Sequence, residues 1–305
     1  MKNDRLSRCL GDIDDKFIDE AADYKKKSRR RGVYYLAAAL AACVIIALAV
    51  QMRPSATISQ RPDDPPAESS APAEADDGIH IPAIELPEPA DGLAVDMIAC
   101  VVYDGAVYTQ GEQLDNAAPL LGEYLGRATG SLDEWSRESD YVEFAGTMSG
   151  ELYTVVGYDP GFRICCLGGD GSALLLERLN GITLNTGADL FDTRLHLAER
   201  MEGVTYLTHS DWNDAVYDFK PLGLDEGTVS SFLDELCAGK FVYTWETDPD
   251  IYDRAVQGHL FFAMSDGTTV ELRLIEGGYV GYQNLGWCFV KMPGAVFDAV
   301  LAACA

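Results

Sequence analysis

Two acidic segments in the C-terminal half contain residue types that bind metal ions or sugars. Residues 211–214 read Asp-Trp-Asn-Asp and follow His209, and three aspartates alternate over residues 248–253. A calcium loop needs alternating oxygen ligands, a glycine turn and a later carboxylate, and neither segment has the full set. We therefore interpret the first segment as a polar loop and the second as a turn around Pro249.

Nucleophilic catalysis would need a serine or cysteine, a histidine base and a residue that orients the base. His196, His209 and His259 are scattered, and no Gly-x-Ser-x-Gly segment occurs. His259 opens an apolar segment, which is typical of an edge-strand histidine. The Gly-Gly-Asp-Gly segment 168–171 lacks the lysine of a phosphate-binding loop. The sequence predicts no catalytic residue and no enzyme, although its many carboxylates leave a glycosidase pair open without singling one out.

A group of aromatic residues near the C-terminus has two interpretations. Tyr279, Tyr282, Trp287 and Phe289 are interspersed with glycines that leave room beside the rings, so they could line a binding face. Packing in the core or on the sheet is the simpler interpretation, and we favour it.

The cysteines bear on metal binding and on disulfides. The chain has eight cysteines, and the six beyond residue 92 show no repeating framework: Cys100, Cys165, Cys166, Cys237, Cys288 and Cys304. Neighbouring residues of a strand point to opposite faces, so Cys165 and Cys166 cannot enter one metal site from the same strand. No Cys-x2-Cys or His-x3-Cys-x2-Cys zinc pattern occurs. We expect buried free thiols in preference to disulfides, no metal and no other cofactor.

Positive and negative charges are distributed unevenly along the chain. The chain has 23 basic and 49 acidic residues, of which 10 basic and 7 acidic ones precede Gly32. The remainder therefore has 13 basic and 42 acidic residues and a net charge of −29. Nucleic-acid affinity depends largely on neutralising phosphates, which excludes nucleic acid as a partner of this part.

An uninterrupted apolar run over residues 32–52 follows six basic residues in the segment 25–31. About twenty residues at about 1.5 Å each match the roughly 30 Å hydrocarbon layer of a lipid bilayer. Basic flanks stay on the cytoplasmic side. The sequence therefore predicts one transmembrane helix in the cell membrane, with a cytoplasmic N-terminus and an extracytoplasmic C-terminus.

A lipoprotein signal is the alternative for this run, because residues 40–43 read Leu-Ala-Ala-Cys. A lipoprotein would be cleaved and acylated at Cys43. The apolar character continues through residues 44–50, however, and the leader would be long, so we favour an uncleaved anchor.

The cytoplasmic tail, residues 1–31, has an apolar stripe at helical spacing, which consists of Leu6, Leu10, Ile13, Phe17, Ala21 and Tyr24. The tail is either a juxtamembrane extension of the membrane helix or a docking helix for a cytoplasmic protein. In the second case Leu6, Leu10, Ile13 and Phe17 would contact the partner.

Residues 53–92 are rich in proline, alanine, aspartate and glutamate, which predicts a disordered linker. Residues 93–305 are expected to form an extracytoplasmic α+β domain, or two subdomains of about 93–200 and 204–305. We expect a hairpin over 101–108 and a helix at 224–238, and any helix within 120–132 should be short. A second hairpin is expected over 260–275, and a final helix at 295–303. Further strands are expected at 141–144, 151–157, 162–167, 173–179, 181–184, 241–245, 279–282 and 288–291. The predicted fold class is thus an α+β ectodomain with an antiparallel sheet and flanking helices.

The tail sequence of residues 6–21, with the basic cluster and alanine-rich run after it, resembles that of many single-pass membrane proteins of Gram-positive bacteria. Some of these resemble membrane anti-sigma factors. Segments 132–135, 157–163 and 266–273 are similar to stretches in uncharacterised ectodomains of this group. The resemblance implies a sigma factor as the partner of the tail, and it implies no activity for the ectodomain.

The sequence therefore predicts a single-pass envelope-signal transducer of the anti-sigma type, with an extracytoplasmic domain that binds an unidentified ligand. The alternative is a structural or adhesive envelope protein with an inert tail. An extracytoplasmic hydrolase is a third, less favoured hypothesis, because it would need two convergent carboxylates or a Ser–His pair.

Overall fold

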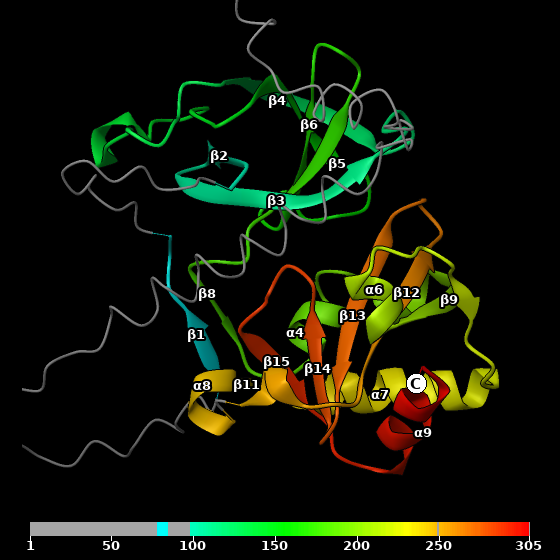
Figure 1. Cartoon of the computed structure of the whole chain (residues 1–305). Helices are drawn as coiled ribbons and strands as arrows, with labels where there is room; N and C mark the ends of the chain where they lie inside the picture. The colour runs from blue at the N-terminus through cyan, green and yellow to red at the C-terminus, as the bar shows by residue number, and fades with distance from the viewer. Residues whose placement is uncertain (1–77, 85–97, 249, 305) are drawn as a thin grey trace, which may run out of the picture. The chain divides into compact units, whose positions relative to one another are not determined.

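The computed structural model describes residues 78–84, 98–248 and 250–304, and these residues form an α+β fold with antiparallel sheets and few helices (Figure 1). The predicted fold class is confirmed to this extent. No helix within the described residues is long and apolar enough to cross a membrane. The predicted membrane run 32–52 and the tail residues Leu6, Leu10, Ile13 and Phe17 lie outside them.

The first half of the domain forms a six-stranded antiparallel sheet in the order β2-β3-β7-β6-β5-β4. Its strands are β2 (Cys100–Tyr103), β3 (Ala106–Leu114), β4 (Leu121–Thr129), β5 (Ser149–Val155), β6 (Arg163–Leu167) and β7 (Ala173–Glu177). The predicted hairpin between β2 and β3 is confirmed. Asp104 and Gly105 at its tip both have positive φ, 50° and 66°, as a tight two-residue hairpin turn requires.

The second half forms a seven-stranded antiparallel sheet in the order β10-β9-β12-β13-β14-β15-β11. Its strands are β9 (Met201–Thr208), β10 (Lys220–Pro221), β11 (Lys240–Tyr243), β12 (Gln257–Met264), β13 (Thr269–Ile275), β14 (Tyr279–Tyr282) and β15 (Cys288–Lys291). The predicted hairpin of β12 and β13 is present, and its turn contains Gly267 with φ +85°.

The described helices are short apart from two. They are α4 (Ala188–Phe191), α5 (Leu197–Arg200), α6 (His209–Asn213), α7 (Glu226–Ala238), α8 (Thr244–Thr247) and α9 (Ala295–Ala303), with single 3₁₀ turns η1 (Glu138–Asp140) and η2 (Ile251–Asp253). Helix α7 begins after Asp225, whose side chain accepts a hydrogen bond from the Thr228 backbone N–H at 3.0 Å. Its apolar face and that of α9 pack on the seven-stranded sheet, and α6 contacts β9 and β12.

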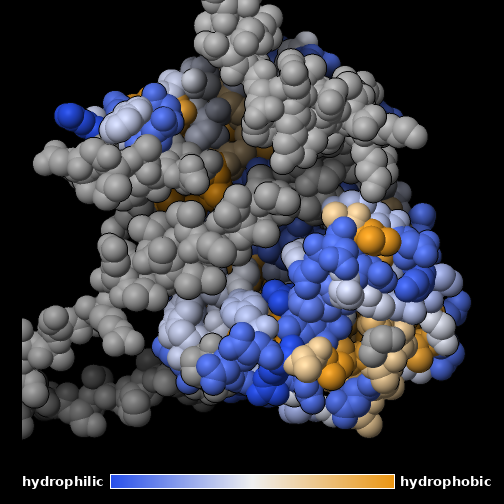
Figure 2. All heavy atoms as spheres, in the orientation of Figure 1, coloured by the Kyte–Doolittle hydropathy of each residue, from blue (hydrophilic) through white to orange (hydrophobic). Residues whose placement is uncertain are grey.

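The largest hydrophobic cluster contains residues of both sheets. Cys165 and Leu175 of the six-stranded sheet belong to it, together with Leu260 and Phe262 of the seven-stranded sheet. Cys166, next to Cys165, points to the other face and joins a separate cluster, as strand alternation predicted. On the side shown in Figure 2, hydrophilic residues cover most of the coloured surface and hydrophobic ones form small separate areas. The two sheets thus share a common core.

The predicted linker over 53–92 is wrong at its C-terminal part, because β1 (Ile79–Ile81) pairs with β8 (Ile182–Leu184). Ile79 and Ile81 are buried and alternate with exposed His80. Two apolar residues are a weak local signal, and only a partner strand about 100 residues later gives them a core to enter. The rest of the predicted linker lies outside the described residues.

One other expectation for local structure is wrong, and two long strands were not predicted. Segment 120–132, where any helix was expected to be short, contains the nine-residue strand β4, which pairs with β5. Segment 141–144 forms no strand, because Phe144 adopts a left-handed backbone with φ +66°. Strand β9 was not predicted, because Glu202 and Gly203 interrupt the apolar pattern in its first half.

Candidate functional site

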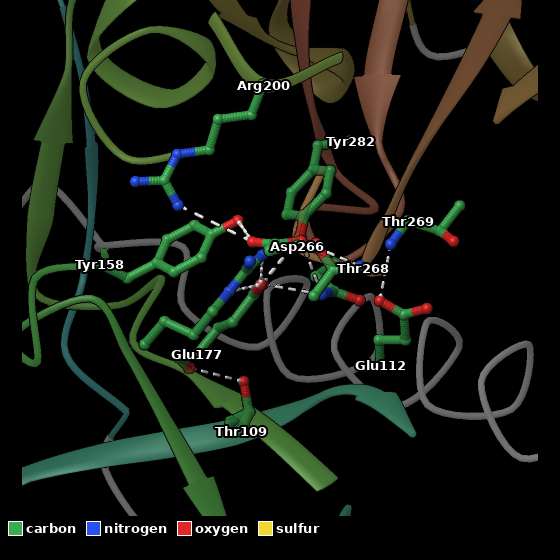
Figure 3. A network of polar contacts seen from close by, with 11 residues as sticks. Thr109, Glu112, Tyr158, Glu177, Arg200, Asp266, Thr268, Thr269 and Tyr282 are labelled. Atoms are coloured by element: carbon green, nitrogen blue, oxygen red, sulfur yellow. Dashed lines mark hydrogen bonds and ion pairs between the residues drawn. The ribbon is translucent and has the colours of Figure 1, made fainter. Parts of the chain in front are cut away.

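A buried polar network connects the two sheets (Figure 3). Arg163 of β6 and Glu177 of β7 are 2% and 1% exposed, and Arg163 Nη2 lies 2.5 Å from Glu177 Oε1. The seven-stranded sheet contributes Tyr282, whose hydroxyl donates to Glu177 at 2.9 Å, and the adjoining loop contributes Asn284, whose Nδ2 donates at 2.7 Å. Glu177 therefore accepts hydrogen bonds from side chains of both halves of the domain.

Electrostatics within this network follow from burial. Burial acts to lower the pKa of Arg163, but the facing carboxylate of Glu177, together with smaller effects of Tyr282 and Tyr158, outweighs it and the pKa rises. Burial and Glu177 raise the pKa of Tyr282 well above its ordinary value. The guanidinium also lies 4.4 Å from the centre of the Tyr158 ring, a cation–π geometry. Arg163 therefore remains charged in the interior because every neighbour favours its cationic form.

Two further contacts extend the network along the junction. The Tyr158 hydroxyl donates to Asp266 at 2.8 Å, and Arg200 Nη1 lies 3.7 Å from the same carboxylate. The Thr269 backbone N–H donates to Glu112 at 2.8 Å. Burial raises the pKa of Glu112 to about 7. These contacts hold the two sheets in one arrangement, and the network is best interpreted as structural.

A second cluster contains His209 and His259. The edge-strand interpretation of His259 is wrong, because β12 lies between β9 and β13 in the sheet. His259 of β12 is buried, and its Nδ1 lies 3.1 Å from Oε1 of Glu271 on β13. The Trp212 indole N–H, from α6, donates to the same oxygen at 2.8 Å. His209 Nδ1 lies 3.1 Å from His259 Nε2, and the Trp212 ring stacks on His259 with centroids 4.4 Å apart. The hydrogen bonds thus run from Glu271 through His259 to His209.

Burial also sets the charge state of this cluster. It lowers the pKa of His259 to about 3, assisted by Arg273, and that of His209 to about 4. It raises the pKa of Glu271 to about 7. Near neutral pH both imidazoles are therefore neutral. When Glu271 is ionised, His259 donates to it through Nδ1, and His209 then donates through Nδ1 to His259 Nε2. His209 Nε2 is left as an acceptor on a half-buried side chain.

This geometry fits a proton relay or an acceptor site better than a nucleophilic centre. Within the described part of the chain, the two histidines are bonded to each other, His259 is also bonded to Glu271, and neither is bonded to a serine, threonine or cysteine. No group of three or more His, Cys, Asp or Glu side chains that could hold a metal occurs among the residues described.

Helix α6 replaces the polar loop that the sequence predicted for segment 211–214. Thr208 caps it, accepting from the Asp211 N–H at 3.1 Å, and the helix directs Trp212 onto His259. The close spacing of His209 and Trp212 was a usable signal for this segment. Their contacts were not predictable, because His259 lies 50 residues from His209 and Glu271 lies 59 residues from Trp212. In the other acidic segment Asp248 pairs with Arg254 across the predicted turn.

The packing interpretation is correct for most of the aromatic group. Tyr279, Tyr282 and Phe289 are buried, at 4%, 5% and 2% exposed. Trp287 differs, because it is half-buried and stacks against Tyr243 and Trp245.

The six described cysteines are all free thiols, and all but Cys237 are buried. Burial raises the pKa of Cys165 and Cys166 to about 11 each.

Comparison with known proteins adds no relative: no family model, no curated protein and no solved structure matches this chain. The fold and clusters define an α+β domain with antiparallel sheets.

Proposed function

We propose that this chain is a single-pass membrane protein whose extracytoplasmic α+β domain binds a ligand, and that its cytoplasmic tail transmits the signal in the manner of an anti-sigma factor. The observation that carries the proposal is the junction of segment 25–31, with six positive charges, and the apolar run 32–52. Such a junction orients the acidic remainder of the chain outside the cell.

Two features of the described domain support a role in binding. The half-buried imidazole of His209 and the stacked rings of Tyr243, Trp245 and Trp287 offer places for a ligand at its surface. The described histidine cluster has no nucleophile bonded to it, which favours binding over catalysis. The six described cysteines are free and none belongs to a metal-binding group, so we propose no cofactor.

The tail would act through its apolar stripe. An external event that altered the anchor, or triggered its proteolysis, would change whether Leu10, Ile13 and Phe17 hold a cytoplasmic sigma factor. A stripe of this kind gains stability by packing on a partner, since short isolated helices are marginal in water.

Pull-down of the full-length protein from detergent extracts of the source cells, with detection of sigma factors, tests the transducer role. Ile13→Asp and Phe17→Asp should abolish recovery. Ile18→Asp is the matched control, because it places the same charge at an apolar position next to the stripe. If no sigma factor is recovered with the wild type, or if all three variants behave alike, the proposal is refuted.

Orientation has a separate test. Protease added to intact cells should cleave the chain beyond residue 92, and an untouched protein would contradict the proposed topology.

The second candidate is a structural or adhesive envelope protein with an inert tail, and the cluster of Tyr243, Trp245 and Trp287, in which Trp245 is exposed, favours it. Deleting residues 1–24 separates the two functions, because attachment to the envelope would survive the deletion and signalling would not.

A further inference from the structure

Three aromatic side chains meet at one edge of the seven-stranded sheet. Tyr243 ends the edge strand β11, Trp245 follows in α8, and Trp287 immediately precedes β15. The ring centroids lie 4.6 Å apart for Tyr243–Trp245, 5.3 Å for Trp245–Trp287 and 5.7 Å for Tyr243–Trp287. Their planes differ by only 7–23°. We call these three residues the aromatic platform.

The platform lies at the surface and not in the core. Trp245 is 47% exposed, whereas Tyr243 and Trp287 are half-buried beneath it. Exposed tryptophan loses the free energy that burial of its large apolar surface would give. A side chain kept in this position is suited to stacking against a ligand.

The backbone holds the platform in place before any ligand arrives. The Tyr243 hydroxyl donates to the backbone carbonyl of His80, which belongs to β1. Thr244 donates to the Trp287 carbonyl through its backbone N–H at 3.3 Å and its hydroxyl at 3.4 Å. A ligand that stacks here would therefore not have to order the rings, which favours affinity.

The platform also has groups that can form hydrogen bonds. Among the described residues no acceptor is bonded to the indole N–H of Trp245 or Trp287, in contrast to that of Trp212, which donates to Glu271. The exposed Glu246 follows Trp245 in the same helix and lies close enough to Tyr243 to affect its pKa, which rises chiefly through burial. The platform thus combines apolar ring faces with donors and an acceptor at their edges.

We propose that the aromatic platform binds a neutral β-linked glycan, with one sugar ring stacked on the open face of Trp245. In a β-linked glucose-type glycan the linkages and hydroxyls are equatorial, so each pyranose keeps a flat apolar face of C–H groups with hydroxyls around its rim, which match the ring faces and the polar groups beside them. The proposal names the ligand class of the binding domain inferred above and rests on that function.

Two other ligand classes fit the platform less well. A cationic ligand is held by rings that face it from several directions, whereas these planes are nearly parallel. An anionic polymer would be repelled, because the chain beyond residue 52 has 42 acidic and 13 basic residues.

The test is calorimetric titration of the full-length protein with chitohexaose and cellohexaose, in a detergent without a sugar headgroup. Wild-type protein should bind at least one of them, and Trp245→Ala should weaken binding by about tenfold or more. Trp135→Ala is the matched control, because Trp135 is 53% exposed and belongs to none of the described aromatic contacts. Trp245→Phe should retain part of the affinity, and thermal unfolding checks that each variant is folded.

Absence of binding to both glycans would overturn the inference, as would equal losses in the Trp245→Ala and Trp135→Ala proteins. Binding of tetramethylammonium with no glycan binding would also overturn it. The sigma-factor pull-down does not involve glycans, so a negative titration with a positive pull-down would remove the ligand class alone. A positive titration with a negative pull-down would remove only the transducer role.

Discussion

Replacing Glu177 with alanine should strongly destabilise the fold. The carboxylate is 1% exposed, and it accepts hydrogen bonds from Arg163, Tyr282 and Asn284. Its removal leaves the Arg163 charge buried without a counter-ion, and the neighbouring donors lose their acceptor. Breaking a buried pair from one side costs about 3–5 kcal/mol. At roughly 2–4 °C per kcal/mol for a domain of this size, we expect Tm to fall by roughly 6–20 °C.

Thermal unfolding of the full-length protein, followed by near-ultraviolet circular dichroism, measures this loss. Glu134→Ala is the control, because Glu134 is an exposed carboxylate outside the network and its loss should change the free energy of unfolding by less than about 0.5 kcal/mol. The double variant Arg163→Met with Glu177→Leu removes both charges and should be more stable than Glu177→Ala alone.

Equal unfolding temperatures of Glu177→Ala and Glu134→Ala would show that the buried carboxylate does not stabilise the fold. A double variant less stable than Glu177→Ala would show that the loss does not come from an unpaired charge.

Three other predictions concern burial. The first concerns Glu112, whose pKa is about 7 in the folded chain and 4.5 ordinarily, so its ionisation destabilises the wild-type fold as pH rises through this range. Glu112→Gln removes this ionisation. Its free energy of unfolding should therefore gain about 2 kcal/mol over the wild type between about pH 5 and about pH 8, a value reduced for partial exposure of the side chain. Gly187→Ala should lower the free energy of unfolding in urea by about 2 kcal/mol, because the added Cβ would lie 1.9 Å from the Leu236 carbonyl oxygen. Gly223→Ala is the control and should leave it unchanged, because an added Cβ there would have no atom within 4 Å. Among the six described cysteines, iodoacetamide followed by mass spectrometry should modify Cys237 first, because the others are buried and burial raises thiol pKa.

Each of these has a contrary outcome. Parallel pH–stability curves for Glu112→Gln and the wild type would place that carboxyl in water. A stable Gly187→Ala protein would show that α4 and α7 do not approach closely. Rapid alkylation of Cys288 would show that its strand opens to solvent.

The sequence by itself predicted the elements whose signals are local. Asp104-Gly105 and Asp266-Gly267 specify tight turns because the turn conformations favour these residues, so both hairpins were predictable. Helix α7 has its cap at Asp225 and its apolar positions at helical spacing, and both signals lie within about fourteen residues. Burial of Cys165 and Cys166 on opposite faces follows from strand alternation alone.

Tertiary structure alone decided the strand order, the entry of Ile79 and Ile81 into a sheet, and the assembly of the clusters. Trp212 is 59 residues from Glu271, and Glu177 is 105 residues from Tyr282, so no local pattern reports either contact. Each side chain has an ordinary environment in its own segment, and its burial, charge state and partners arise only when distant strands are brought together. Sequence periodicity records which face of an element is apolar, but not which other element covers that face.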